Sequence, residues 1–514
     1  METNKHGRRT FLAAASGGAA MIAALSGETV QGAGQTVSRT LSGTGTDICY
    51  MSAKDLAALI RTRKLSAREV MTAHLERINR INPQINAIVA KLSDQQCLAL
   101  ADAADQRVAK KEQVGPLHGL PIAFKDLEAA VGFPFTRGST IYKNTMPAED
   151  SVLVERLRRA GAIPIGKTNT PEFGMGSHTY NKVYGTTVNP YDHTKSAGGS
   201  SGGAGAALAA GLLPIADGSD NAGSLRNPGN FNNVVGMRPT VGLVPSTPAT
   251  LPFIGFAVKG PMARTVADTA FLLSVMAGPD ARDPACYPSD PSIFRGTLER
   301  SFRGVHVAWC LDLGGLPIDP SVRAVLTVQR NTFEAMGCIV EDACPDLSGA
   351  DSIFLTIRSF RSAATYGSLL EQYRSQMKPE AVEEIEKGLS LKSSDVVQAM
   401  VQHGQLLERM RRFQEKYEFI LCAVNQIPPF DARLDWPKSI DGVQMEHYVA
   451  WMKSAYWITV TFRPAISVPA GFTSAGLPVG LQIVGRHRAD FALLQFAHAF
   501  EQQTRFGTRR PSIL

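Results

Sequence analysis

No stretch of this 514-residue sequence holds a block of five or six like charges, although the net charge is +7. The 53 lysines and arginines occur mostly singly or in short pairs, among 46 acidic residues. A nucleic-acid-binding protein would gather its basic residues on one face or along one helix. The scattered charge therefore argues against nucleic acid as a partner.

The sequence also lacks metal and redox motifs. Its seven cysteines fit neither a zinc nor a CxxC spacing, and its ten histidines include no HxxxH pair with a nearby glutamate. We therefore expect no metal and no cofactor. An oxidising compartment permits disulfides, but seven is an odd number and a large core needs none. We interpret the cysteines as mostly buried apolar residues.

The sequence has no apolar run long enough to span a membrane. Its most apolar stretch lies near the start. The stretch "RRTFLAAASGGAAMIAAL" begins with Arg8 and Arg9 and ends at Leu25. It is too short for a membrane span, and its charge, apolar run and small-residue exit follow the order of an export signal. The paired arginines predict a twin-arginine signal over residues 1–34. We expect a periplasmic or extracellular protein without stable membrane insertion after signal removal.

Strands and helices alternate along the rest of the chain, which predicts an α/β fold. Apolar residues at helical spacing predict helices over about 50–100, with Ser52 and Ser66 as N-caps and Pro83 as a break in the pattern. The segments "PIAFK" and "IPIGKT" read as short strands, and residues 351–415 read as largely helical. No repeat or linker divides the chain, so one large domain is expected.

The stretch Gly161–Thr168 matches the phosphate-binding pattern GxxxxGK[ST]. A phosphate loop follows a strand and opens a helix whose first amides bind the anion. Here a helix precedes Gly161, and Pro164 removes one amide. We interpret the match as chance and Lys167 as a structural residue.

The stretch Gly198–Gly202 matches the nucleophile elbow GxSxG, which would make Ser200 a nucleophile. An elbow needs a strand running into it, but the upstream segment "NPYDHTKSA" is a turn-rich loop. A histidine base is also needed, and none of the downstream candidates has a distinctive setting: His403, His447, His487 and His498. A histidine-dependent esterase stays open as an alternative.

Three separated stretches favour a different reading. They are "GLPIAFKD" with Lys125, "GGSSGGAGAALAAG" with Ser200 and Ser201, and "DGSDNAGSLRNPGN" with Ser224 in a bed of small residues. In order and spacing they resemble the amidase signature family of serine amide hydrolases. The resemblance extends through "VGMRPTVGLVP" and "PAISVPAGFTSAGLPVGLQIVG", and so covers nearly the whole chain after the signal.

The resemblance implies a single large domain over residues 35–514, with a mixed twisted β-sheet covered by helices on both faces. Within it we expect three parts after the helical N-terminal stretch: a catalytic core over about 115–270, a more variable substrate-side region over about 290–450, and C-terminal strands and a helix over 451–514.

The resemblance also implies a catalytic triad. Ser224 would attack the carbonyl, Ser200 would bridge, and Lys125 would act as the base. An ordinary lysine has a pKa of about 10.4 and stays protonated at neutral pH. Burial disfavours the charged form, and the apolar run "PIAF" before Lys125 could supply that burial. Activity should then rise with pH as Lys125 loses its proton.

Backbone amides of Asn221, Ala222, Gly223 and Ser224 could bind the oxyanion. Relatives usually have Thr-Gly where this chain has Asn221 and Ala222, so the site depends on a backbone that tolerates a Cβ at Ala222. The segment "TVTFRPAISVP" departs as well, because Thr459, Phe462 and Arg463 replace Asn, Gly and an apolar residue.

By the same resemblance, Met175, Gly176 and Ser177 lie on a loop that lines the acyl pocket. Ser201 is open between hydrogen bonding near the triad and capping the following helix. Asp220 and Arg226 are expected to hold the nucleophile loop.

The implied reaction is hydrolysis of a carboxamide through an acyl-enzyme, giving a carboxylic acid and an amine or ammonia. Esters and carbamates share this chemistry. The Asn221–Ala222–Gly223 loop resembles those of hydrolases of small xenobiotic or cyclic amides. An export signal argues against the related transfer-RNA amidotransferase subunit. A small-molecule amide is the expected partner, a homodimer stays open, and a non-catalytic binding protein is the remaining alternative.

Overall fold

The computed structural model describes residues 47–247 and 249–512. The expected export signal, residues 1–34, lies outside them. Seventeen strands are described, eight of them in one large sheet. These eight are β8 (Ile215–Asp220), β9 (Val235–Arg238), β10 (Val258–Ala263), β11 (His306–Trp309), β12 (Ile339–Asp342), β13 (Phe419–Ala423), β16 (Ala465–Phe472) and β17 (Pro478–Val484).

The large sheet is mixed, with the strand order β12-β11-β13-β17-β16-β9-β10-β8. Strand β11 pairs in parallel with β12 and β13, and every other neighbouring pair is antiparallel. This confirms the α/β class and the mixed sheet.

A second, three-stranded sheet has the order β1-β3-β2 and carries the strand that ends in the catalytic-lysine candidate. Its strands are β1 (Ile88–Val89), β2 (Pro121–Lys125) and β3 (Ile163–Thr168). The edge strands β2 and β8 of the two sheets are joined where the backbone N–H of Lys125 donates to Asp217. Three two-stranded ribbons complete the strands: β4 (Tyr180–Asn181) with β5 (Gly185–Thr186), β6 (Val188–Asn189) with β7 (Asp192–Ser196), and β14 (Ser439–Ile440) with β15 (Val443–Gln444).

Fifteen α-helices are described, and none of them is long and apolar enough to cross a membrane. They are α1 (Ala53–Arg61), α2 (Ala67–Ile85), α3 (Asp94–Ala109), α4 (Val152–Arg159), α5 (Gly202–Ala209), α6 (Arg226–Phe231), α7 (Val266–Met276), α8 (Pro320–Thr327), α9 (Arg330–Ala335), α10 (Ala350–Tyr366), α11 (Leu370–Tyr373), α12 (Pro379–Ser390), α13 (Ser393–Lys416), α14 (Lys453–Thr459) and α15 (Asp490–Thr504). Residues 351–415 are largely helical, as expected.

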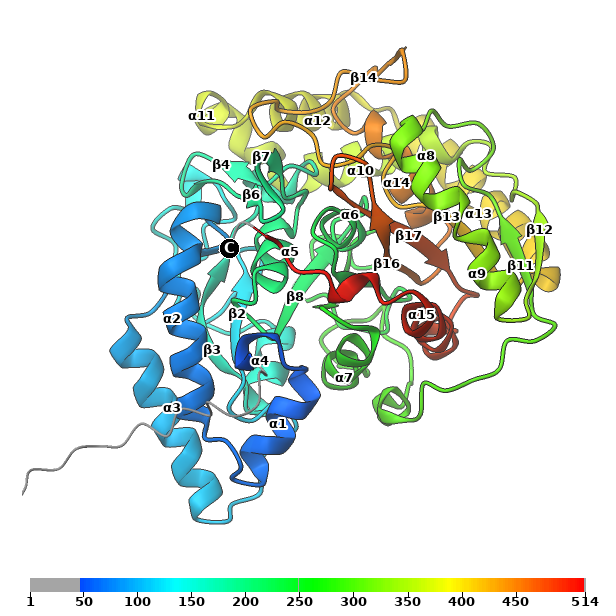
Figure 1. Ribbon diagram of the computed structural model, residues 1–514. Helices are drawn as coiled ribbons and strands as arrows, with labels where there is room; N and C mark the ends of the chain where they lie inside the picture. Colours follow the sequence, from blue (N-terminus) through cyan, green and yellow to red (C-terminus); the bar gives the residue numbers. More distant parts are fainter. Residues whose placement is uncertain (1–46, 248, 513–514) are drawn as a thin grey trace, which may run out of the picture. The chain divides into compact units, whose positions relative to one another are not determined.

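Helices cover both faces of the large sheet (Figure 1). Successive side chains of a strand point to opposite faces. Leu481 and Ile483 of β17 pack in one apolar cluster with α7 and α15, whereas Val484 packs in a second cluster with α10, α13 and α14. Both faces are therefore buried, which explains why Gln482 is the one polar residue of β17.

The N-terminal helices begin where the sequence predicts. Ser52 accepts a hydrogen bond from the Asp55 amide, and Ser66 forms a capping box at the start of α2. The predicted break at Pro83 is wrong, because α2 continues to Ile85. Pro83 lies in the last turn with its ring exposed, and the helix ends at Asn86 in the left-handed conformation.

The cysteines differ from expectation in one pair. Cys49, Cys97, Cys338 and Cys422 are buried free thiols and Cys286 is partly buried, but Cys310 and Cys344 form a disulfide. Cys310 directly follows β11, and Cys344 lies just past β12. Because these strands are parallel neighbours, their carboxyl ends meet at one edge of the sheet, and the two Cα atoms lie 5.2 Å apart. Spacing along the chain carries no sign of this proximity.

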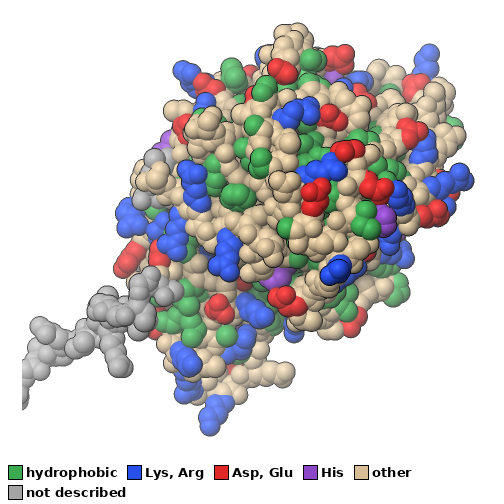
Figure 2. Space-filling view, turned by 45° about the vertical axis from the view of Figure 1, so that its right-hand side comes forward, with side chains coloured by type: hydrophobic (Ala, Val, Ile, Leu, Met, Phe, Trp, Pro, Cys, Tyr) green, Lys and Arg blue, Asp and Glu red, His purple; other side chains and the backbone are tan. Residues whose placement is uncertain are grey.

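Charged side chains of both signs are interspersed over the face drawn in Figure 2. The even mixture agrees with the scattered charge of the sequence. Exposed ion pairs occur on the surface of the protein, such as those of Arg411 with Glu408 and Glu415.

Candidate active site

The three triad candidates come from different parts of the fold; Ser200 and Ser224 line one cavity, and Lys125 lies behind Ser200. Lys125 ends β2, Ser200 lies just before α5, and Ser224 lies in the turn between β8 and α6. All three side chains are buried. Ser200 and Ser224 line a cavity of about 100 Å³.

The Lys125 ammonium lies among hydroxyl groups. Its Nζ donates to Oγ of Ser200 at 2.7 Å, of Ser201 at 2.8 Å and of Ser219 at 3.0 Å. Burial lowers the pKa of Lys125 to about 7, and the negative charge of Asp217 acts in the opposite direction. A large fraction of this lysine is therefore neutral near pH 7 and able to accept a proton.

Ser200 and Ser201 hold the loop before α5 close to the nucleophile turn. The Gly199–Ser200 peptide bond is cis. The Ser201 side chain accepts from Lys125 and makes no capping bond to α5. Its backbone N–H donates to the carbonyl oxygen of Ser224 at 3.2 Å.

The hydroxyls of Ser200 and Ser224 face the same cavity, but no hydrogen bond joins them in the described part of the chain. Catalytic hydrogen bonds are often long in enzymes without substrate and tighten when it binds. The arrangement is therefore compatible with proton transfer from Ser224 to Ser200 in the loaded enzyme.

The backbone amides around Ser224 divide into two groups. The Gly223 N–H donates to Asp220 Oδ1 at 2.9 Å. Within residues 47–247 and 249–512, the N–H groups of Asn221, Ala222 and Ser224 have no hydrogen-bond partner. Asn221, Ala222 and Ser224 line the cavity, so these three amides are the donors left for an oxyanion.

The turn needs a glycine at one position, and the chain keeps it there. Gly223 has φ of +100°, and a Cβ on it would lie 2.5 Å from both Ala455 Cβ and Asn227 Oδ1. Ala222 is not in the left-handed region. The replacement of glycine by Ala222 therefore leaves the backbone of the turn unstrained.

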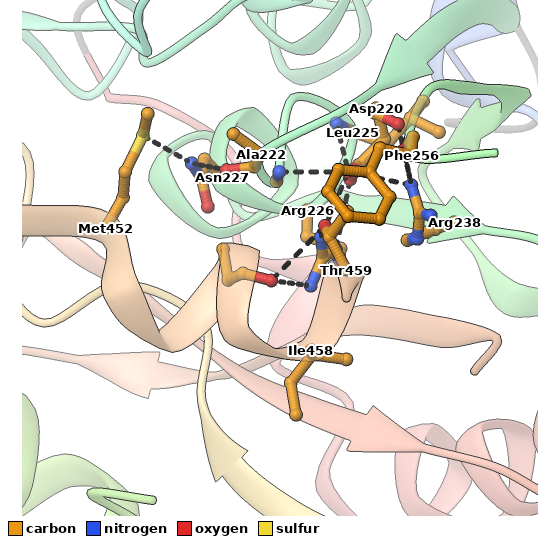
Figure 3. A network of polar contacts seen from close by, with 12 residues as sticks. Asp220, Ala222, Leu225, Arg226, Asn227, Arg238, Phe256, Met452, Ile458 and Thr459 are labelled. Carbon is orange, nitrogen blue, oxygen red and sulfur yellow. Dashed lines mark hydrogen bonds and ion pairs between the residues drawn. The ribbon is translucent and has the colours of Figure 1, made fainter. Parts of the chain in front are cut away.

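Arg226 and Asp220 hold the nucleophile turn from behind (Figure 3). The buried guanidinium of Arg226 donates to Asp220 through Nε and Nη2, both at 3.0 Å, and to Thr459 Oγ1 at 2.9 Å. Burial alone would raise the pKa of Asp220, but the charges of Arg226 and Arg238 outweigh it and lower the pKa. Arg226 thus supports the loop and does not face the cavity.

The unusual residues at and after the end of α14 do not line the cavity. Thr459 accepts from Arg226, Phe462 packs edge-on against Phe256, and Arg463 Nε donates to Gln414 at 2.6 Å. These departures from the family pattern therefore act on the scaffold.

Only part of the loop expected to line the acyl pocket does so. Met175 and Gly176 line the cavity, but Ser177 does not. The Ser177 hydroxyl donates to the Gly199 carbonyl at 2.6 Å and accepts from Asn227 at 3.0 Å. Ser177 therefore braces the loop that carries Ser200.

Sequence reasoning missed Asp217 and Ser219. They alternate along β8 and contact Lys125 from the same side, Asp217 at its backbone N–H and Ser219 at its Nζ. Burial raises the pKa of Asp217 to about 7. The period of two in "DGSD" is the signal that could have identified them.

The two other motifs have structural roles or no catalytic partner here. Lys167 is buried in β3, donates to the Glu128 carbonyl oxygen and lies 3.7 Å from Asp126. No histidine of the described residues lines the cavity with Ser200; His403, for example, contacts the Val460 carbonyl oxygen. The same residues contain no group of His, Cys, Asp or Glu arranged to hold a metal ion.

Comparison with known proteins agrees with this geometry. The Amidase family profile matches residues 69–494. An acylamidase from Rhodococcus erythropolis is 36% identical over 466 residues, which cover 90% of this chain and 97% of that protein.

Two solved structures share the fold. A bacterial aryl acylamidase of the amidase signature family superposes with a TM-score of 0.84 at 26% identity, over 91% of this chain and 100% of that one. A 6-aminohexanoate cyclic dimer hydrolase complexed with substrate gives a TM-score of 0.81 at 26% identity, with the same coverage. The chain therefore belongs to the Amidase family and is an amide-hydrolysing enzyme.

Proposed function

We propose that this enzyme hydrolyses a small carboxamide through an acyl-enzyme on Ser224. The observation that carries the proposal is the contact between Lys125 Nζ and Ser200 Oγ, 2.7 Å long and buried beside the cavity. A lysine with a pKa lowered to about 7 by burial can act as a general base near neutrality.

In the proposed first half-reaction, the Ser224 hydroxyl attacks the substrate carbonyl. Its proton passes through the Ser200 hydroxyl to neutral Lys125. The tetrahedral oxyanion is bound by the free amides of Asn221, Ala222 and Ser224. One such donor typically contributes about 2.7–4 kcal/mol to the transition state.

The intermediate then collapses, and the C–N bond breaks. The proton on Lys125 returns through Ser200 to the leaving nitrogen, so that an amine or ammonia departs. Water attacks the Ser224 ester by the same relay and releases the acid. Esters can enter the same cycle with an alcohol as the leaving group, and carbamates can enter it by forming a carbamoyl-enzyme on Ser224.

The size of the cavity supports a short acyl group. Ligand pockets for drug-sized molecules are about 300–1,000 Å³, but the cavity at Ser224 measures about 100 Å³. Leu127, Phe173 and Tyr366 also line a neighbouring chamber of about 540 Å³. A substrate longer than a few carbons would extend into this chamber. Acyl anilides and cyclic amides are the first candidates, because the related enzymes are named for them.

Intact-mass labelling with a fluorophosphonate tests the mechanism. We expect one adduct on the wild type and none on Ser224→Ala, Lys125→Met or Ser200→Ala. An adduct that survives Ser224→Ala would contradict the proposal and point to Ser200 as in the histidine-dependent alternative. Turnover of acetanilide by the wild type, and its loss in the same three variants, would link the labelled serine to amide hydrolysis.

We also propose that the protein is exported through the twin-arginine route. The Cys310–Cys344 disulfide supports an oxidising destination. A homodimer stays a prediction, which light scattering of the purified protein would test.

A further inference from the structure

We propose that Arg361 binds a carboxylate on the substrate, so that this enzyme prefers amides that carry a second, anionic group. The guanidinium lines the cavity of Ser200 and Ser224 and is the one charged group there without a partner among the described residues. The inference rests on the proposed function, because it names the substrate class of that site.

One face of helix α10 forms a wall of the cavity. Arg358, Arg361, Ser362 and Thr365 line it, and their spacing of three, four and seven places them on one side of the helix. Arg361 and Thr365 also line the larger neighbouring chamber. Arg361 therefore lies where a substrate would pass from the nucleophile into the chamber.

The second arginine of this wall is already neutralised. Arg358 Nε donates to Glu384 Oε2 at 2.7 Å, and its Nη2 donates to Tyr448 at 2.6 Å. The other carboxylate oxygen of Glu384 accepts from Ser362 at 2.5 Å. Tyr448 also donates to Oε2, so three side chains hold Glu384, and no hydrogen bond or ion pair joins it to Arg361 among the described residues.

The remaining carboxylate of the cavity is also occupied. Asp220 Oδ1 accepts from Gly223 and Arg226, and its Oδ2 accepts from Leu225 and Arg226. With Asp220 and Glu384 both paired, Arg361 leaves the cavity with one uncompensated positive charge. No ion pair or side-chain hydrogen bond of Arg361 occurs in residues 47–247 and 249–512.

Apart from Arg361, the chamber next to the cavity is lined by two positive and two negative side chains, so it does not offset the charge of Arg361. Arg137 lies over the rings of Phe135 and Tyr142, and it too has no ion pair among the described residues. Lys259 is paired with Glu128 at 2.6 Å. Asp283 lines only the chamber, where its oxygens accept from backbone amides.

A half-buried guanidinium without a partner is costly, since burial removes its hydration. Burial accordingly lowers the pKa of Arg361. A carboxylate would replace the lost water, and the planar fork of arginine can hold both of its oxygens. The chemistry therefore selects an anionic group over a neutral polar one. That group could belong to the acyl part or to the amine part of the substrate.

Binding to the Ser224→Ala protein tests the inference without catalysis. Two acids are compared with neutral counterparts of matched shape by calorimetry: glutaric acid monoanilide with valeranilide for the acyl side, and meta-acetamidobenzoate with N-acetyl-meta-toluidine for the amine side. A hydrogen bond to a charged group contributes about 1.5–3 kcal/mol, or roughly 10–100-fold in affinity. We expect one acid to bind tighter than its counterpart by that factor, which also identifies the side.

The added change Arg361→Gln should remove this preference and leave the affinity for the neutral compounds within about twofold. Arg412→Gln removes the same charge from an exposed position on α13 and should change nothing. Arg361→Lys keeps the charge without the fork and should keep part of the preference. If Arg361→Gln melts at a lower temperature than the parent protein, Arg361→Lys is used in its place.

Equal binding of acids and neutral compounds, no binding of either acid, or a preference that survives Arg361→Gln would overturn the inference. Turnover separates it from the proposed function. A wild type that hydrolyses valeranilide without preferring either acid keeps the function and loses the inference. A protein that binds one acid through Arg361 but turns over none of the four compounds keeps the anion site and loses the function.

Discussion

Asp217 and Lys125 are joined by a hydrogen bond from the backbone N–H of Lys125 to Asp217 Oδ1, 3.1 Å long, which brings a buried carboxylate next to the proposed base. Burial lowers the pKa of this lysine, and the charge of Asp217 raises it. The working pH range of the enzyme therefore depends on both residues.

The first prediction concerns pH. Lys125 must be neutral to accept a proton, and burial lowers its pKa to about 7. We expect kcat/KM for acetanilide to rise about tenfold per pH unit below pH 7 and to level off above it. A profile that stays flat from pH 5 to pH 9 would exclude Lys125 as the titrating base.

The second prediction concerns Asp217. Asp217→Asn keeps the size of the side chain but removes the negative charge that favours protonated Lys125. The pKa of Lys125 should fall, and the rising limb of the pH profile should move to lower pH. Asp441→Asn, at an exposed site, is the matched control and should leave the profile in place. A limb that moves to higher pH would contradict this role.

The third prediction concerns the support of the nucleophile turn. Arg226→Met removes the main partner of buried Asp220, and breaking a buried pair costs about 3–5 kcal/mol. We expect a large decrease in the free energy of unfolding in urea. Arg282→Gln breaks pairs of a half-exposed arginine with Glu155 and Asp280 and should give a much smaller decrease, of about 1 kcal/mol or less. Similar losses in both variants would show that the turn is not specially stabilised.

The fourth prediction concerns export. Replacing Arg8 and Arg9 together by lysine should retain the protein in the cytoplasm, because the twin-arginine route reads the arginine pair. Fractionation followed by immunoblotting measures the distribution. Unchanged export of this double variant would remove the twin-arginine assignment.

Much of the fold was predictable from short-range patterns. The strand "PIAFK" and the caps at Ser52 and Ser66 are local signals, and the structure confirms them. The prediction of a break at Pro83 was wrong because α2 accommodates this proline in its last turn. Residue preferences therefore predict that a helix is present better than they predict the residue at which it ends.

Contacts between distant segments were the part that the sequence could not supply. Cys310 and Cys344 meet because β11 and β12 are parallel neighbours. Ser219 reaches Lys125 because β8 lies beside β2. Arg361 comes from the helical segment that sequence motifs left unassigned, and only the fold places α10 and the nucleophile turn on the same cavity.

The proposed base and the proposed nucleophile belong to different sheets. Lys125 ends the edge strand of the three-stranded sheet, and Ser224 follows the edge strand of the eight-stranded one. Catalysis therefore requires the contact between β2 and β8, where the two sheets meet. In rising denaturant, activity should fall when the contact between β2 and β8 is lost, at concentrations where Trp309 of β11, buried in the large sheet, still gives its native fluorescence. Loss of activity would then detect partial unfolding before the large sheet unfolds.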